Sequence, residues 1–267
     1  MLTLKAICLI AVTTMASVHL HCQEVTKIRL VFLGDTASDS WKGAMQGLEE
    51  ANAQGAFLGY EYELLPARDE NDALAMRPLS IIANLSPLRL MRLAERSGQI
   101  AVLNVAAQDN ELREACEENL FHTIPSSAMR QHAEQQWRRK SPSSRAGAKA
   151  WHRSFKKYAA AQLNNRYERS FGVEMSDNAW ASWAAVKILS DLVVRLNESE
   201  PGPIGEALRE DLSFDGQKGI TMSFRDTGQL RQPLLLVEDD RIVGEAPVEG
   251  IVNSSNLDSL GLAGCLK

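Results

Sequence analysis

The chain has 267 residues, of which 45% are hydrophobic and 24% are charged, and its formal net charge is −5. These values are ordinary for a soluble globular protein, and the length suits one large domain or two small ones. The acidic balance argues against nucleic acid or an anionic membrane as a partner.

The first residues have the pattern of an export signal. The apolar run Ala6–Val18 follows a lysine, is too short to span a bilayer, and contains small residues, Ala16-Ser17, that suit cleavage. Residues 1–22 are therefore predicted to be a signal peptide, which places the mature protein in the periplasm. An uncleaved anchor is one alternative. A lipid on Cys22 is another, although His21 stands where such sites want a small residue.

The segments that follow alternate between strand and helix patterns. Lys27–Gly34 and Tyr60–Leu65 are apolar runs that predict buried strands. Ser40–Ala53 has apolar residues at helical spacing, and Asp72–Leu79 predicts a short helix. This alternation favours an α/β fold with a doubly wound parallel sheet, whose βα core covers residues 25–136.

A polar loop follows the first predicted strand. Thr36 and Ser38 lie in it, just before a helix whose first N–H groups can hold an anion. These two residues are therefore candidate ligand contacts, and the alternative interpretation is that the loop only caps the helix. The loop has neither a GxGxxG nor a Walker pattern, which disfavours a nucleotide cofactor.

The stretch from Ser80 to Pro125 continues the alternation. Ser80–Leu85 and Ile100–Val105 predict two buried strands, and the segment between them has helical spacing. In a βαβ unit of this kind, ligands bind beyond the carboxyl ends of the strands. The residues at those ends form the candidate ligand-binding set: Asn84, Leu85, Ser86, Asn104, Ala106, Ala107 and Gln108.

The middle of the chain contains a break between helical segments. Ser126–Arg139 predicts a helix, and the Ser/Pro/Gly-rich stretch after it makes residues 137–150 a linker by composition. Residues 151–212 then predict helices that complete the first domain, at Trp151–Phe171, Asn178–Leu196 and Ile204–Leu212.

The last part of the chain is rich in β-strand patterns. Residues 213–252 contain apolar runs joined by polar turns, at Ile220–Phe224, Leu230–Val237 and Arg241–Ala246, in an antiparallel style. We expect these strands either to form a small ribbon on the first domain or to be poorly ordered. A C-terminal tail, residues 253–267, follows them.

The cysteines predict one disulfide. Of the four, Cys8 lies within the signal segment and Cys22 at its end, which leaves Cys116 and Cys265. In an oxidising compartment an even count favours a bond between them, which would tie the tail to the first half of the chain. Two free thiols are the alternative.

No pattern in the sequence indicates catalysis. His122, His132 and His152 lack the spacing of metal ligands, and a GxSxG nucleophile elbow is absent. Several aspartates follow predicted strands, but their spacing does not separate a general acid from a general base. We therefore predict that the protein is not an enzyme and that it uses no cofactor or metal.

Four segments, taken in order, resemble one family. They read NVAAQDNELREACEENLFHTIPSSAM, AWHRSFKKYAAAQLNNRYERSFG, GQKGITMSFRDTGQLRQPLLL and NLDSLG, the last followed by Cys265. Together they are similar to the type I periplasmic binding proteins of the branched-chain-amino-acid kind. Within that group they most resemble the substrate-binding proteins associated with PQQ-dependent alcohol dehydrogenase systems. The resemblance covers nearly the whole chain after residue 24.

The resemblance implies a solute-binding protein that delivers a small organic ligand to an inner-membrane ABC permease. It also implies a two-lobed clamp, but the strands and helices of a second lobe are missing or shortened between Pro125 and Met175. The alternative function is therefore a single-lobe accessory or interaction protein that no longer binds a small ligand. Apolar surface left uncovered by the short middle would favour a homodimer.

Overall fold

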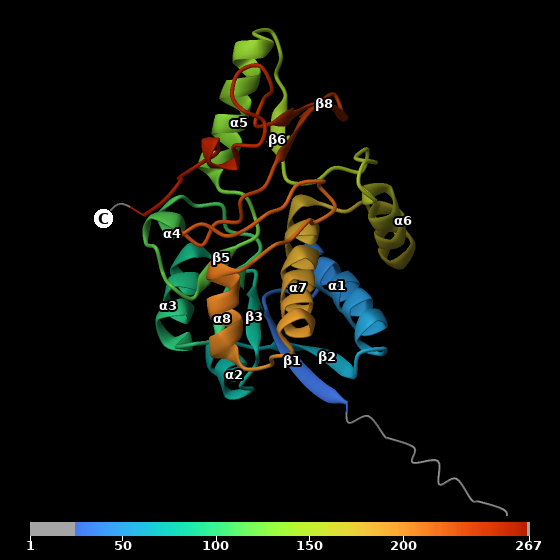
Figure 1. Cartoon of the computed structure of the whole chain (residues 1–267), viewed down its shortest axis with the longest axis vertical. Helices are drawn as coiled ribbons and strands as arrows, with labels where there is room; N and C mark the ends of the chain where they lie inside the picture. The colour runs from blue at the N-terminus through green and yellow to red at the C-terminus, as the bar shows by residue number, and fades with distance from the viewer. Residues whose placement is uncertain (1–24, 266–267) are drawn as a thin grey trace, which may run out of the picture.

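A computed structural model describes residues 25–265 of the chain. The predicted signal peptide lies outside these residues. The described part consists of a large body, built on a parallel sheet, and a small body above it in the view of Figure 1. No helix among the described residues has the length and apolar character needed to cross a membrane.

The large body contains a five-stranded parallel sheet in the order β2-β1-β3-β4-β5. Helices connect successive strands, so the predicted doubly wound α/β fold is confirmed. The elements of this part are β1 (Thr26–Leu33), α1 (Asp39–Gly55), β2 (Tyr60–Ala67), α2 (Glu70–Ala75), β3 (Ser80–Ala83), α3 (Pro87–Ser97), β4 (Ala101–Asn104), α4 (Glu111–Glu114) and β5 (Leu120–His122).

Helices cover both faces of this sheet. Alternate residues of a strand point to opposite faces, so Leu30 and Phe32 of β1 belong to one apolar core, and Val31 and Leu33 belong to the other. The first core is completed by α1 and by α6 (Ala160–Phe171), α7 (Asp177–Leu196) and α8 (Pro201–Glu210). The second core lies under α2 and α3.

Helices α1 and α7 pack closely against one another. A Cβ atom at Gly43 would lie 1.9 Å from the backbone oxygen of Ala179, so only glycine permits this approach. Ser38 and Ser176 begin the two helices by accepting hydrogen bonds from backbone N–H groups in the first turn. The two tryptophans of α7, Trp180 and Trp183, are buried in the core.

The small body has its own core. It consists of α5 (Ser127–Lys140) and an antiparallel sheet in the order β6-β7-β8, with strands Gly147–Lys149, Leu234–Glu238 and Arg241–Ala246. One face of the sheet packs on α5 through residues such as Ala148, Leu234 and Leu236. Leu235 and Val237 belong to the core of the large body. The ribbon expected from the sequence therefore lies between α5 and the large body.

The segment boundaries differ most from the sequence-based expectations in three places. Residues 137–150, expected to be a linker, contain the end of α5 and the strand β6. The expected helix at Trp151–Phe171 begins only at Ala160, because Tyr158 and Ala159 have positive φ angles. The expected strand Ile220–Phe224 forms only isolated bridges, between Phe214 and Met222 and between Phe224 and Leu230.

The tail links the two bodies. After the short 3-10 helix η1 (Leu257–Ser259), the chain runs along the small body and then reaches α4 of the large body, as Figure 1 shows. There Cys265 forms a disulfide with Cys116, 149 residues earlier, with the Cα atoms 6.1 Å apart. The structure thus contains the disulfide that the cysteine count predicts.

Candidate functional site

The predicted ligand-binding residues come together at the carboxyl edge of the parallel sheet. The segments after β1, β3 and β4 all end there, because parallel strands share one direction. The structure divides these residues among two hollows, the loop after β4 and the loop after β1.

Asn104 organises the loop that follows β4. Its side-chain oxygen accepts hydrogen bonds from the N–H groups of Ala106 and Ala107, at 3.1 and 2.9 Å. Its side-chain nitrogen donates to the backbone oxygen of Ala107 at 2.8 Å and lies 3.0 Å from Nδ1 of His122. The side chain is fully buried. Asn104 and these two N–H groups are therefore committed to shaping the loop.

His122 is held in one neutral form by this contact. Because the nitrogen of Asn104 donates, Nδ1 of His122 must accept, which places the ring proton on Nε2. The pKa of His122 lies well below its ordinary value, mainly because the side chain is completely buried and secondly because the positive charge of Arg113 is near. The contact joins the ends of β4 and β5 and fixes the rim of the sheet.

The loop after β1 is used mainly as a cap. Ser38 accepts a hydrogen bond from Trp41 N at 3.3 Å and donates to the backbone oxygen of Asp35 at 2.5 Å. Thr36 is exposed and forms no side-chain hydrogen bond with the described residues. The capping interpretation therefore accounts for Ser38, and Thr36 stays a predicted ligand contact.

Asn84, Leu85 and Ser86 line the first hollow, of about 270 Å³, together with residues of the loops after β1 and β2. Ser86 begins α3 without a side-chain capping bond, so its hydroxyl group is free of that task. The neighbouring charge is mixed, because Asp35, Arg68 and Arg89 also line this hollow.

The second hollow is a cleft of about 500 Å³ between the two bodies. Gln108 is the only one of the predicted residues that lines it. The small body contributes Arg130 and Glu134 of α5, the strand β6, and Asp240 in the β7–β8 turn. The large body contributes a run before α6 and the start of α7, including Trp151, His152, Arg153, Glu174, Met175, Ser176 and Asp177.

Ion pairs join the two bodies across this cleft. Arg130 Nη1 lies 2.8 Å from Asp177 Oδ2, and Asp177 Oδ1 accepts a hydrogen bond from Trp151 N at 2.9 Å. Asp240 accepts from His152 Nε2 at 3.0 Å and also pairs with Arg153. The hydrogen bond from Arg153, and then that from His152, lower the pKa of the Asp240 carboxyl.

Two cleft side chains, Gln108 and Lys149, form no hydrogen bond or ion pair with the described residues. Both are partly or fully exposed. They offer an amide and an ammonium group to a bound molecule, whereas most of the other charges in the cleft are already paired. The cleft is lined mainly by polar side chains, so it suits a small polar solute.

Two buried cations support the rim of the cleft from within the large body. Arg113 donates through Nε to Gln229 Oε1 at 2.9 Å, and Gln229 Nε2 donates to the backbone oxygens of His122 and Ile124. Burial lowers the pKa of Arg113 to about 9. The guanidinium has no carboxylate partner among the described residues, but it also donates to the backbone oxygens of Ala107, Asp109 and Ile124.

Lys218 repeats this arrangement. Its Nζ donates to Gln232 Oε1 at 2.8 Å and lies 3.9 Å from the centre of the Trp180 ring. Gln232 Nε2 in turn donates to the backbone oxygen of Thr123 at 2.7 Å. Burial lowers the pKa of Lys218. The two cation–glutamine pairs therefore hold two chain segments together. Residues 122–124 lead from the large body into the small body, and residues 229–233 lead into it a second time, before β7.

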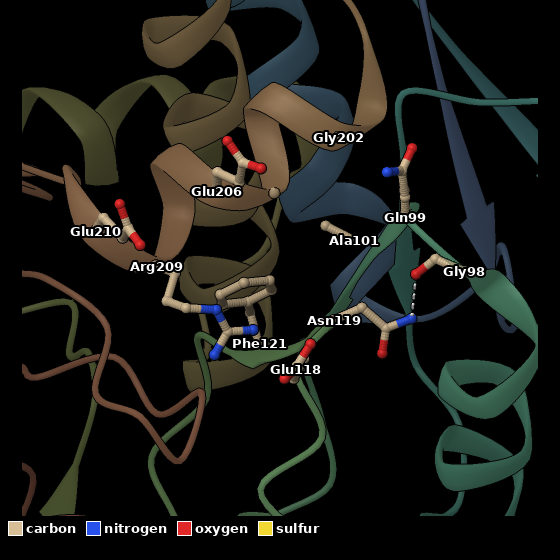
Figure 2. A pocket seen from close by; sticks show the side chains of 11 residues that line it. Gly98, Gln99, Ala101, Glu118, Asn119, Phe121, Gly202, Glu206, Arg209 and Glu210 are labelled. Atoms are coloured by element: carbon tan, nitrogen blue, oxygen red, sulfur yellow. Dashed lines mark hydrogen bonds between the residues drawn. The ribbon is translucent and has the colours of Figure 1, made fainter.

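A further hollow lies at the opposite edge of the sheet, under α8 (Figure 2). It has a volume of about 410 Å³, and Phe121 and Ala101 line it together with Gly202 and Gly205. The guanidinium of Arg209 lies 5.6 Å from the centre of the Phe121 ring. Exposed glutamates form its rim, at 118, 206 and 210. It is remote from every residue predicted to bind a ligand.

The residues that sequence reasoning missed are those of the cleft. Arg130, His152, Asp177 and Asp240 lie far apart in the sequence, and only the packing of the two bodies brings them together. The signal that could have found part of this set is the capping pattern at the start of α7, which places Asp177 at a helix N-terminus. Within the described residues, no three His, Cys, Asp or Glu side chains are grouped so as to hold a metal ion.

Comparisons with known proteins were made at the level of sequence and of structure. No protein-family model matches the sequence, and no curated protein is significantly similar to it. Several solved structures do match. A periplasmic binding protein from Burkholderia mallei has a TM-score of 0.67 at 10% identity, over 90% of this chain and 99% of that one.

Two other similar structures are of ABC transporter proteins. A branched-chain amino acid ABC transporter periplasmic ligand-binding protein from Burkholderia xenovorans has a TM-score of 0.66 at 11% identity, over 82% of this chain and 95% of that one. An ABC transporter substrate-binding protein from Desulfitobacterium hafniense has a TM-score of 0.64 at 13% identity, over 81% and 99%. At these identities the likeness concerns the fold, and the chain has the fold of the type I periplasmic binding proteins.

Proposed function

We propose that this protein is the periplasmic substrate-binding component of an ABC-type transport system and that it binds a small organic solute in the cleft between its two bodies. The observation that carries the proposal is the position of the cleft. It lies beyond the carboxyl edge of the parallel sheet, where open α/β sheets bind their ligands. Its volume, about 500 Å³, falls within the range of small-molecule sites.

The site in this proposal has two parts. Gln108 and Lys149 face the cleft from the large and the small body and supply its unpaired polar groups. Asn84, Leu85, Ser86 and Thr36 line or adjoin the neighbouring edge of the sheet. Asn104, Ala106, Ala107 and Ser38 shape the loops between these parts.

The proposal extends to transport and location. ABC transporter proteins of this fold are expected to deliver solutes to a membrane permease, and the predicted signal peptide would bring this chain to the periplasm. The resemblance of its motifs adds a finer proposal, that the solute is linked to PQQ-dependent alcohol oxidation. Alcohols, aldehydes and carboxylates are therefore the first compounds to test, together with amino acids.

The alternative is an accessory protein of a periplasmic oxidation system that binds a protein partner and no small solute. The size of the small body favours it, because one helix and three short strands form that wall of the cleft. A shallow wall buries less of a ligand than two full lobes would.

Thermal unfolding of the mature protein against amino acids, short alcohols, aldehydes and carboxylates separates these functions. A solute that binds only the folded state adds about 2.7 kcal/mol of stability at 100 times its dissociation constant. The transport proposal expects such a shift with one class of compound. A cooperative transition that no compound shifts would contradict it and favour the accessory function.

A homodimer stays a prediction. Large apolar side chains with high exposure occur at separate places on the described surface: Phe57 at 87%, Leu88 at 61% and Tyr158 at 51%. Sedimentation velocity over a range of concentrations would measure the association. A single species with the mass of one chain would contradict the prediction.

A further inference from the structure

The two aspartates that line the cleft are fully engaged by cations. Asp177 Oδ2 lies 2.8 Å from Arg130 Nη1. Asp240 accepts from His152 Nε2 at 3.0 Å through one oxygen and pairs with Arg153 through the other. A ligand that needs a carboxylate here would have to displace one of these partners.

The two glutamates of the cleft are engaged as well. Glu174 pairs with Arg153. Glu134 Oε1 accepts from Ala148 N at 3.1 Å, and its Oε2 lies 3.9 Å from Arg138 Nη1. Within the described residues, every carboxylate of the cleft therefore has a cationic partner, and none is left to receive an ammonium group from a solute.

Lys149 is the cation of the cleft that has no carboxylate partner among the described residues. It is the last residue of β6, and the side chain of Ala148 before it packs in the core beneath α5. Because successive side chains of a strand point to opposite faces, Lys149 points away from α5 and toward the large body. Its ammonium group is thus available to an anion in the cleft.

Two further groups can donate to the same anion. Arg130 lies beside Lys149, because its Nη1 also donates to the backbone oxygen of Ala148 at 2.6 Å. Nη2 of Arg130 and the side-chain amide of Gln108 form no hydrogen bond with the described residues, and both side chains line the cleft. Figure 1 shows β6 beside α5 and above α7, so these donors belong to the wall that faces the large body.

We propose that the cleft takes a small carboxylate that carries no amino group, and that Lys149 holds its carboxylate. Arg130 and Gln108 donate to the same group from α5 and from the loop after β4. Hydrogen bonds from charged donors to a carboxylate are stronger than those to a neutral oxygen, so an alcohol is held less tightly. This inference rests on the proposed function and names the class of its solute.

An amino acid with the same carbon skeleton fits this cleft less well. Its ammonium group would either lie near Lys149 and Arg130, which repel it, or compete with the cation that already holds a carboxylate. In both cases the ammonium gives up its hydration without a free acceptor to replace it. The pairing of the cleft carboxylates therefore selects against the amine.

Isothermal titration calorimetry of the mature, oxidised protein with matched compounds tests this selectivity. Each set keeps one carbon skeleton and consists of an acid, its amino acid and its alcohol. The sets are propionate, alanine and propanol; isovalerate, valine and isoamyl alcohol; phenylpropionate, phenylalanine and phenylpropanol. We expect at least one acid to bind, and to bind at least about tenfold more tightly than the amino acid and the alcohol of its set.

Variants of Lys149 test the residue itself. Lys149→Gln should weaken binding of that acid at least about tenfold, whereas Lys149→Arg keeps the positive charge and should stay within about threefold of wild type. The matched control is Lys156→Gln, which removes an exposed lysine that lines a neighbouring hollow and should bind as wild type does. Because Lys149 is exposed, its variants should unfold at the wild-type denaturant concentration.

The outcomes separate this inference from the function on which it rests. An amino acid or an alcohol that binds as tightly as the acid of its set would overturn the proposed class and leave a solute site in the cleft. Equal affinity of wild type and Lys149→Gln for the acid would overturn the role of Lys149. Binding of none of these compounds would also overturn the inference, and the proposed function would fail with it only if the wider thermal-unfolding panel gave no shift.

Discussion

Gln229 joins the buried guanidinium of Arg113 to the segment that enters the small body, and its replacement by leucine tests that role. The Gln229 side chain is 1% exposed and accepts from Arg113 Nε at 2.9 Å. Leucine has a similar size but cannot accept or donate a hydrogen bond. The variant therefore leaves one N–H of a buried charge without an acceptor.

The expected loss can be worked out from the partners that remain. Gln229 also donates to the backbone oxygens of His122 and Ile124, at 3.1 Å each. These oxygens keep other donors, Leu230 N for His122 and Arg113 Nη2 for Ile124. The cost therefore falls mainly on the guanidinium, and a hydrogen bond to a charged group contributes about 1.5–3 kcal/mol. We expect Gln229→Leu to lower the free energy of unfolding by about 2–3 kcal/mol.

Guanidinium chloride unfolding of the mature oxidised protein, followed by far-ultraviolet circular dichroism, measures this loss. The matched control is Gln135→Leu on the exposed side of α5, which should change the free energy of unfolding by less than about 0.5 kcal/mol. If the two variants were equally stable, the cation–glutamine pair would carry no stability and the reasoning would be refuted.

Three further outcomes follow from particular contacts. In Gly228→Ala, a Cβ atom would lie 2.0 Å from the backbone oxygen of Leu120, at a residue with a positive φ angle. Urea unfolding should therefore show a free energy of unfolding lower by at least about 2 kcal/mol. The control Gly147→Ala, where no heavy atom lies near the added Cβ, should be close to wild type. Removal of the disulfide in Cys116→Ser/Cys265→Ser frees a loop of 149 residues in the unfolded chain. The chain entropy of that loop should lower the free energy of unfolding by about 5 kcal/mol, and a decrease below about 1 kcal/mol would contradict this entropic account. The pKa of Asp240 is lowered in the folded state, so its contribution to stability is present above about pH 4 and is lost as the pH falls through the folded pKa. The stability difference between wild type and Asp240→Asn should therefore be constant near neutral pH and should shrink in acid, and a difference independent of pH would contradict the ion pair.

The parallel sheet was predictable because its strands are buried on both faces. Buried parallel strands read as continuous apolar runs, as at β1 and β3, and the helices between them have a clear apolar face. Helix starts were also predictable where a serine caps the first turn, as Ser176 does for α7. Local signals of these kinds are sufficient for the large body.

The small body was not predictable, because its signals are weak within each segment. The strand β6 has only three residues, Gly147–Lys149, and it lies in a stretch with the composition of a linker. Its pairing partner, β7, lies more than 80 residues later in the chain, so the two strands pair only by closing a long loop. The same holds for the cleft, where the Arg130–Asp177 pair exists only after α5 has docked above α7.

The predicted ligand set illustrates a second limit. The strand-end rule selects one edge of the sheet, but it cannot tell which polar groups at that edge remain free. Asn104 follows β4 as expected, yet its amide satisfies its own loop and His122. Gln108, four residues later, keeps its amide unpaired toward the cleft. That difference depends on hydrogen bonds that only the folded chain reveals.

Titration of one solute against matched variants tests the central claim most directly. The solute is the compound that shifts thermal unfolding of the wild type most strongly, and calorimetry gives its affinity for wild type, Gln108→Ala and Gln135→Ala. The account predicts about tenfold weaker binding to Gln108→Ala, which corresponds to about 1.4 kcal/mol, and unchanged binding to Gln135→Ala. Equal affinity for all three proteins, or the absence of any binding solute, would contradict a solute site in the cleft.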